Sequence, residues 1–78
     1  MKINLKCFAT LSNPDTCDYN DSTPYDLAAG QTVEDLAERA GIARTDVKIA
    51  FVNGQIAGLD TTLRDGDRVG LAPAVGGM

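Results

Sequence analysis

One helical pattern near the middle of the chain constrains the fold more than any other feature of the sequence. Thr32 is a good N-cap residue, and Asp35 three positions later completes a variant of the capping box. Gly41 is the type of residue that commonly follows a helix end. Apolar residues recur between these positions at the i, i+3, i+4, i+7 spacing of one helix face, namely at Val33, Leu36, Ala37 and Ala40. This narrow, alanine-rich stripe predicts a single helix that lies close against a sheet.

Most of the remaining sequence has the pattern of β-strands. Apolar and polar residues alternate over residues 2–8, which predicts a strand with one buried face. The inward residues of this strand are Ile3, Leu5 and Cys7. Phe8 falls on its otherwise polar face, and Asn53-Gly54 predicts a hairpin later in the chain. Further strands are expected over residues 24–28, 47–52, 55–57 and 68–72.

The predicted elements follow the order β-β-α-β-β-β. The first and last strands can lie side by side only in parallel, at the centre of the sheet, and this is the β-grasp arrangement. The sequence therefore predicts an α+β fold with a mixed sheet of four to five strands and one main helix packed on one face. Because Pro73 should end strand pairing, we expect a β-grasp domain over residues 1–73 and a flexible C-terminal tail over residues 74–78.

Length and charge restrict the classes of partner. A chain of 78 residues is one domain with one modest core and little room for a deep cavity. The N-terminus lacks the apolar segment of a signal peptide, and no apolar run is long enough to span a bilayer. A cytoplasmic location without a membrane partner is therefore expected.

The seven basic residues are scattered along the sequence, so nucleic acid is not expected as a partner. The net charge of −4 suits a partner with a basic docking face.

The chain has few residues of the types that catalyse reactions or bind metals. It has no histidine, which excludes general-base catalysis by that residue, and its two cysteines fall short of a zinc site. Residues 12–23 are rich in aspartate but lack the ligand spacing of a calcium loop, so no metal is expected. Sequence leaves a Cys7–Cys17 disulfide open, although reduced cysteines are the usual state in the cytosol.

Five short segments together resemble a known family. They are Phe8-Ala9-Thr10-Leu11, Gln31-Thr32-Val33-Glu34-Asp35-Leu36, Val52-Asn53-Gly54, Leu63-Arg64-Asp65-Gly66-Asp67-Arg68-Val69 and Pro73-Ala74-Val75-Gly76-Gly77. Their order and spacing are similar to those of the MoaD/ThiS family of ubiquitin-like sulfur carriers, and more closely to its MoaD-like branch, the small subunit of molybdopterin synthase. The resemblance implies a ubiquitin-like β-grasp.

The resemblance also implies a function. An E1-like adenylating enzyme of the MoeB/ThiF type uses ATP to adenylate the C-terminal glycine carboxylate, and sulfur then replaces AMP to give a thiocarboxylate. In the MoaD branch a MoaE-like large subunit uses the sulfur for the molybdenum or tungsten pterin cofactor. In the ThiS branch a thiazole synthase uses it for thiamin. This chain would then be a carrier rather than an enzyme, with no bound cofactor of its own.

The resemblance carries over to particular residues. Gly76 and Gly77 would form the site of adenylation and thiocarboxylate formation, because glycine has no side chain to obstruct a narrow channel. Residues expected to contact the partner are Phe8, Pro73, Ala74 and Val75. Known carriers end in Gly-Gly, whereas this chain ends in Met78. Either a peptidase removes Met78, which the glycine argument favours, or Met78 replaces the last glycine and blocks adenylation.

Other interpretations stay open at this point. Gly76-Gly77 is also compatible with a frayed terminus, and Phe8 with a side chain that folds back over the sheet edge. The activated tail could instead be joined to lysines of other proteins, as in a ubiquitin-type modifier. A β-grasp domain with an unreactive tail could also serve as a non-catalytic binding subunit.

Overall fold

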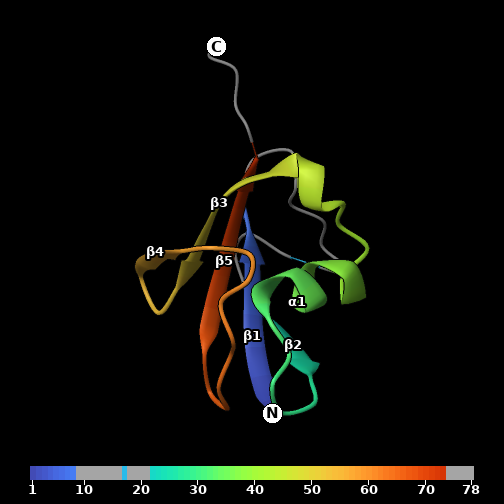
Figure 1. Cartoon of the computed structure of the whole chain (residues 1–78), viewed down its shortest axis with the longest axis vertical. Coiled ribbons are helices and arrows are strands. Elements are labelled where there is room, and N and C mark those ends of the chain that lie inside the picture. The colour runs from blue at the N-terminus through green and yellow to red at the C-terminus, as the bar shows by residue number, and fades with distance from the viewer. Residues whose placement is uncertain (9–16, 18–21, 74–78) are drawn as a thin grey trace.

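A computed structural model of the chain describes residues 1–8, 17 and 22–73. Within them a mixed sheet lies behind a single α-helix (Figure 1). The elements are β1 (Lys2–Cys7), β2 (Thr23–Asp26), α1 (Val33–Arg39), the 3-10 helix η2 (Arg44–Asp46), β3 (Val47–Val52), β4 (Gln55–Ala57) and β5 (Arg68–Pro73). Every strand predicted from the sequence is present, with bounds that differ by one to two residues at several ends.

The sheet has five strands in the order β2-β1-β5-β3-β4. β1 and β5 pair in parallel, with Leu5 opposite Val69 and Cys7 opposite Leu71. The pairs β1–β2, β3–β4 and β3–β5 are antiparallel. The parallel pairing of the first and last strands confirms the predicted ubiquitin-like β-grasp.

The hydrophobic core lies between α1 and one face of the sheet. Strand alternation places Ile3 and Leu5 of β1 and Leu71 of β5 on this face, where each is fully buried. Leu36 of α1 packs in the same cluster, as does Leu63 from the connector before β5. Complete burial of each of these side chains contributes about 1.5–3 kcal/mol relative to exposure. The core therefore holds the helix on one face of the sheet and leaves the other face uncovered by it.

The predicted capping box at the start of α1 is confirmed. The Asp35 amide donates to the Thr32 hydroxyl at 3.3 Å, and the Thr32 amide donates to the Asp35 carboxylate at 2.9 Å. The next amides of α1, which have no partner within the helix, donate instead to the connector: Val33 N–H to the Thr61 carbonyl at 3.1 Å and Glu34 N–H to the Leu59 carbonyl at 2.9 Å. The connector thus fixes the start of the helix against the sheet.

A β-bulge in β3 changes which side chains face the core. Val47 pairs with Pro73, whereas Ile49 pairs with Ala72, so β3 contains one extra residue at this point. Both Val47 and Ala50 consequently pack toward the core, which strict alternation would forbid. β5 also extends to Pro73, one residue further than predicted, because this proline still pairs with Val47 at the strand end.

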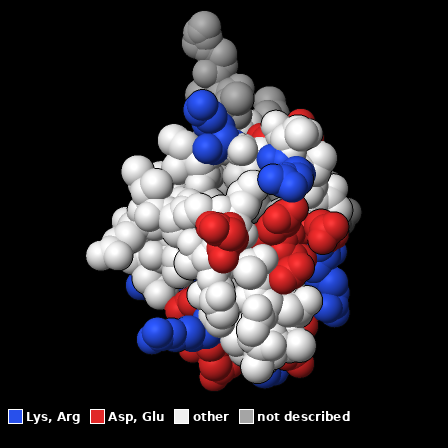
Figure 2. Space-filling model, in the orientation of Figure 1, with Lys and Arg blue, Asp and Glu red and all other residues white. Residues whose placement is uncertain are grey.

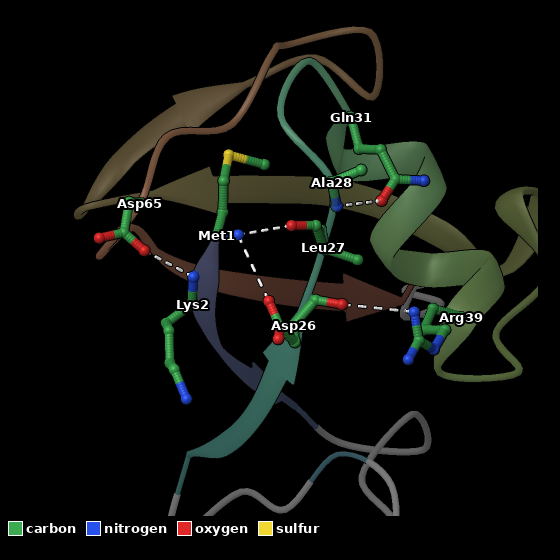
Figure 3. Close-up of polar contacts among 8 residues, drawn as sticks. All are labelled: Met1, Lys2, Asp26, Leu27, Ala28, Gln31, Arg39 and Asp65. Carbon is green, nitrogen blue, oxygen red and sulfur yellow. Dashed lines mark hydrogen bonds and ion pairs between the residues drawn. The ribbon is translucent and has the colours of Figure 1, made fainter.

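Hydrogen bonds fasten the chain start to the end of β2 and to neighbouring segments (Figure 3). The Met1 amino group donates to the Leu27 carbonyl and, at 3.3 Å, to the Asp26 carboxylate. The Lys2 amide donates to the Asp65 carboxylate at 2.6 Å. The Arg39 guanidinium of α1 donates to the Asp26 carbonyl at 3.3 Å. Helix, edge strand and central strand are thereby joined at one corner.

The expectation of reduced cysteines is wrong. Cys7 and Cys17 form a disulfide, with their Cα atoms 5.4 Å apart, and both residues are completely buried. The bond holds Cys17 in the core beside β1. A domain this small has a limited core, and covalent links are one way in which small domains gain stability.

In the described part of the chain, no helix is long and apolar enough to cross a membrane.

Candidate functional site

The face of the sheet opposite α1, here called the open face, carries a row of side chains that crosses four strands. Lys6 of β1 is opposite Gly70 of β5, Gly70 is opposite Phe51 of β3, and Phe51 is opposite Ile56 of β4. Residues that are directly opposite in a sheet point to the same face. The neighbours of Gly70 in β5, Val69 and Leu71, are buried on the helix side, which places the whole row on the open face.

Phe8 covers the middle of this row. Its amide donates to the Leu71 carbonyl at 2.9 Å, so the backbone of Phe8 continues the pairing of β1 with β5. Its ring lies over Gly70: a β-carbon at position 70 would be 3.1 Å from Phe8 Cε2 and 3.8 Å from Phe51 Cδ2. A glycine within a strand often marks such a close approach. The alternative in which Phe8 folds over the sheet edge is therefore wrong, because the ring lies on the open face.

The open face is apolar at its centre and hollowed. Phe8, Phe51 and Gly70 line a hollow of about 690 Å³, and Lys6 and Arg68 contribute cationic groups to its lining. Ile56 of β4 is 76% exposed. Ile49, which lies on the same side of β3 as Phe51, is 37% exposed. These are the large apolar residues that the described part of the chain leaves most exposed. Apolar groups gathered on one face mark interaction surfaces more often than scattered ones do.

Asn53 links the β3–β4 hairpin to the start of β5. It has a φ of 53°, and it precedes Gly54 with a φ of 84°, which is the backbone that the Asn-Gly hairpin signal predicts. The Asn53 side chain donates to the Asp67 carboxylate at 2.9 Å and accepts from the Arg68 amide at 3.0 Å. These hydrogen bonds hold the hairpin in place, and the prediction of a turn here is confirmed.

The predicted tail starts at the same end of the sheet as Phe8. Pro73, the last residue of β5, is half-buried and pairs with Val47. Phe8 lies beside this end of β5, because it donates to the Leu71 carbonyl. The other predicted site residues lie outside the described residues, and these are Ala74, Val75, Gly76, Gly77 and Met78. The structure thus brings Phe8 and Pro73 to one end of the sheet and leaves the role of the tail a prediction.

One titratable side chain on the other face has a shifted pKa. Burial raises the pKa of the Tyr25 hydroxyl above 10.0, and the positive charge of Arg39 partly opposes this shift. Tyr25 is opposite Ile3 and packs against the core, on the helix side of the sheet. Its shift is therefore a consequence of packing and does not belong to the open face.

Sequence reasoning named Phe8 for this face but missed three of its neighbours, Phe51, Ile56 and Gly70. Alternation in the sequence puts Phe51 on the same side of its strand as Val47 and Ile49 but does not decide which side is buried. The available signal was Gly70: a glycine in a strand between two inward residues indicates a close approach from the open face.

A family model described as the ThiS family matches residues 18–77. No curated protein is similar enough in sequence to match the chain. The family match confirms the resemblance predicted from the sequence.

Solved structures with the same fold match over almost the whole chain. SAMP1 from Haloferax volcanii has a TM-score of 0.72 at 22% identity, with 100% of each chain covered. A Pyrococcus furiosus protein described as molybdopterin converting factor, subunit 1, has a TM-score of 0.71 at 26% identity, with 96% of this chain and 99% of that chain covered. A complex of subunits 1 and 2 of molybdopterin-converting factor from Helicobacter pylori has a TM-score of 0.63 at 17% identity, with 100% of each chain covered.

Proposed function

Since the chain belongs to the ThiS family, we propose that it is a sulfur carrier whose C-terminal glycine is activated by another protein. An E1-like enzyme of the MoeB/ThiF type adenylates the Gly77 carboxylate with ATP, and sulfur replaces AMP to give a thiocarboxylate. The chain supplies the reacting carboxylate and a docking surface, and the partner supplies the catalysis. The proposed location of this reaction is the cytoplasm.

The extent of the family match carries this proposal. The match ends at residue 77, so it includes Gly76 and Gly77 and leaves Met78 outside. This supports the alignment in which Met78 is an extra residue that a peptidase removes. A terminal Gly-Gly suits entry into an adenylation site, because glycine adopts most backbone conformations and adds no bulk.

The molybdenum or tungsten pterin cofactor is the proposed destination of the sulfur. The Pyrococcus furiosus neighbour, at 26% identity, is described as subunit 1 of molybdopterin converting factor. The Helicobacter pylori neighbour is a complex of subunits 1 and 2 of that factor, which supports a MoaE-like large subunit as the second partner of this chain. Delivery to a thiazole synthase for thiamin is the alternative within the family.

The open face is the proposed docking surface for these partners. Phe8 lies beside the end of β5, after which the tail begins, so we expect a partner that holds this face to receive the tail as well. Ile56 and Phe51 add exposed apolar area on the same face. When the partner encloses the open face and the tail, water is kept away from the reactive acyl adenylate.

The test compares two forms of the chain, one ending at Gly77 and one ending at Met78. Each is incubated with the E1-like enzyme of the same organism, ATP and a sulfur donor, and its intact mass is measured. The form ending at Gly77 should gain one O-to-S exchange, and the form ending at Met78 should stay unchanged. A Gly77-ended chain that is neither adenylated nor converted would overturn the proposal.

Mass spectrometry in the native host separates the remaining alternatives. A carrier should be found with Gly77 as its C-terminus, whereas Gly-Gly remnants on lysines of other proteins would indicate a modifier. One solved neighbour is SAMP1, and another is described as small archaeal modifier protein 1. The search for Gly-Gly remnants on lysines therefore tests the modifier alternative directly. A binding subunit would instead keep its activity after deletion of residues 76–78.

A further inference from the structure

Acidic side chains gather on the helix side of the described part of the chain. Both glutamates of the sequence, Glu34 and Glu38, lie in α1, as does Asp35. Figure 2 shows a cluster of acidic side chains over the region of this helix, with basic side chains beside it. Part of the net negative charge of −4 therefore lies on the side of the molecule opposite the open face.

The open face has cations beside its apolar centre. Lys6 lies in the row that crosses Gly70, and Arg68 precedes Gly70 by two residues, so both point to this face and line the same hollow as Phe8. Arg68 is exposed and Lys6 is half-buried. In the described part of the chain, the ion pairs involve other groups, Met1 with Asp26 and Arg44 with Glu34. Neither cation of the hollow is neutralised by a carboxylate in that part of the chain.

We propose that the open face binds a protein surface on which carboxylates flank an apolar side chain. The apolar group would enter the hollow beside Phe8 and Phe51, and the carboxylates would face Lys6 and Arg68. This inference rests on the proposed function, because it describes the surface of the partner that receives the tail. It reverses the expectation from net charge, which favoured a basic docking face.

Local charge decides this reversal. Interactions between exposed charges fall off over about 8 Å at physiological salt, so a partner on the open face responds to Lys6 and Arg68 more than to the acids over α1. Charges at the rim of an interface act mainly on the association rate and its salt dependence. A carboxylate introduced at either position should meet the partner's carboxylates and repel them.

The test measures binding of the chain ending at Gly77 to the E1-like enzyme of the same organism, at low and at high salt. Lys6→Glu and Arg68→Glu should each raise Kd about tenfold at low salt, which corresponds to about 1.4 kcal/mol, and slow association. Lys6→Gln and Arg68→Gln should give intermediate values. The differences should shrink at high salt because the charges are then screened.

Arg44→Glu is the matched control, because it changes the net charge equally but lies outside the residues lining the hollow, beside α1. The Kd of this variant should lie within about twofold of that of the original chain. Loss of the exposed ion pair with Glu34 should change the stability of the fold by only about 0–1 kcal/mol. Equal effects of all three charge reversals, or tighter binding by Lys6→Glu or Arg68→Glu, would overturn this inference while leaving the carrier function intact. An original chain that the enzyme neither binds nor adenylates would overturn the proposed function and this inference together. Thermal melts of each variant verify that the fold is retained.

Discussion

The ring of Phe8 lies so close to Gly70 that a β-carbon at that glycine would be 3.1 Å from Phe8 Cε2. The two residues come from opposite ends of the chain and meet because β1 and β5 pair in parallel. Gly70 is thus part of the open face, although it has no side chain of its own. The Phe8 ring can take this position because Gly70 has no β-carbon.

Gly70→Ala should displace the Phe8 ring and weaken binding to the proposed E1-like partner. The stability cost should be about 1 kcal/mol, because the ring is at the surface and can move. Chemical denaturation measures the first effect and a binding titration the second. In a Phe8→Ala background the same substitution has no ring to displace, so its effects should largely vanish. Equal effects in both backgrounds would show that the Phe8–Gly70 contact does not matter.

Ile56→Ser should separate docking from folding. The Ile56 side chain is 76% exposed, so its replacement should change the free energy of unfolding by less than about 0.5 kcal/mol. Binding to the partner should nevertheless weaken, because exposed apolar area is lost from the open face. Unchanged affinity in a titration would place Ile56 outside the interface. Leu36→Ser, in the core, is the contrasting variant and should unfold the domain.

Reduction of the Cys7–Cys17 disulfide should destabilise the domain. The bond closes a loop with a sequence separation of 10, and loss of such a link costs about 2–3 kcal/mol through the entropy of the unfolded chain. Urea denaturation with and without a dithiol reductant measures this difference. The Cys7→Ala/Cys17→Ala double variant should not respond to the reductant. Coincident curves for the oxidised and reduced forms of the original chain would contradict this prediction.

Asn53→Asp should loosen the link between the β3–β4 hairpin and β5. The substitution removes the donor that contacts the Asp67 carboxylate at 2.9 Å and places a second negative charge there. We expect a loss of about 1–3 kcal/mol in stability, measured by chemical denaturation. Asn53→Gly keeps the left-handed backbone and loses only the side-chain bonds, so it should cost less. If both variants cost the same, charge repulsion at Asp67 is not a factor.

The raised pKa of Tyr25 predicts a loss of stability in alkali. Its folded-state pKa lies above the value of 10.0 that we take for the unfolded chain, so the neutral form is favoured in the fold. The stabilisation should be complete below pH 10.0 and decrease as the pH rises through the folded-state value. Denaturation curves across this range should be less steeply pH-dependent for Tyr25→Phe than for the original chain. Identical pH dependence would contradict the role assigned to Tyr25.

Local features of the chain were predictable because they depend on neighbours in sequence. The Thr32–Asp35 capping box, the helix end just before Gly41 and the Asn53-Gly54 hairpin each involve residues a few positions apart. Their physical causes, which are capping, periodicity and backbone preference, act within that distance. The order of the elements then restricted the possible strand arrangements of the sheet, and the parallel pairing of the first and last strands followed from this order.

The candidate site was only partly predictable, because its contacts join distant segments. Phe8 was identified, but which face of β3 is buried depends on the bulge between Val47 and Ile49, which exists only relative to β5. The disulfide likewise depends on how Cys17 packs beside β1. Sequence alone determined the elements, their order and the family resemblance that singles out Gly76-Gly77. Alternation already puts Lys6 and Phe8 on one face of β1, but only the tertiary structure decided that Phe51 of β3 shares this face with them and Arg68, since the packing of the core chooses the side to which each strand turns.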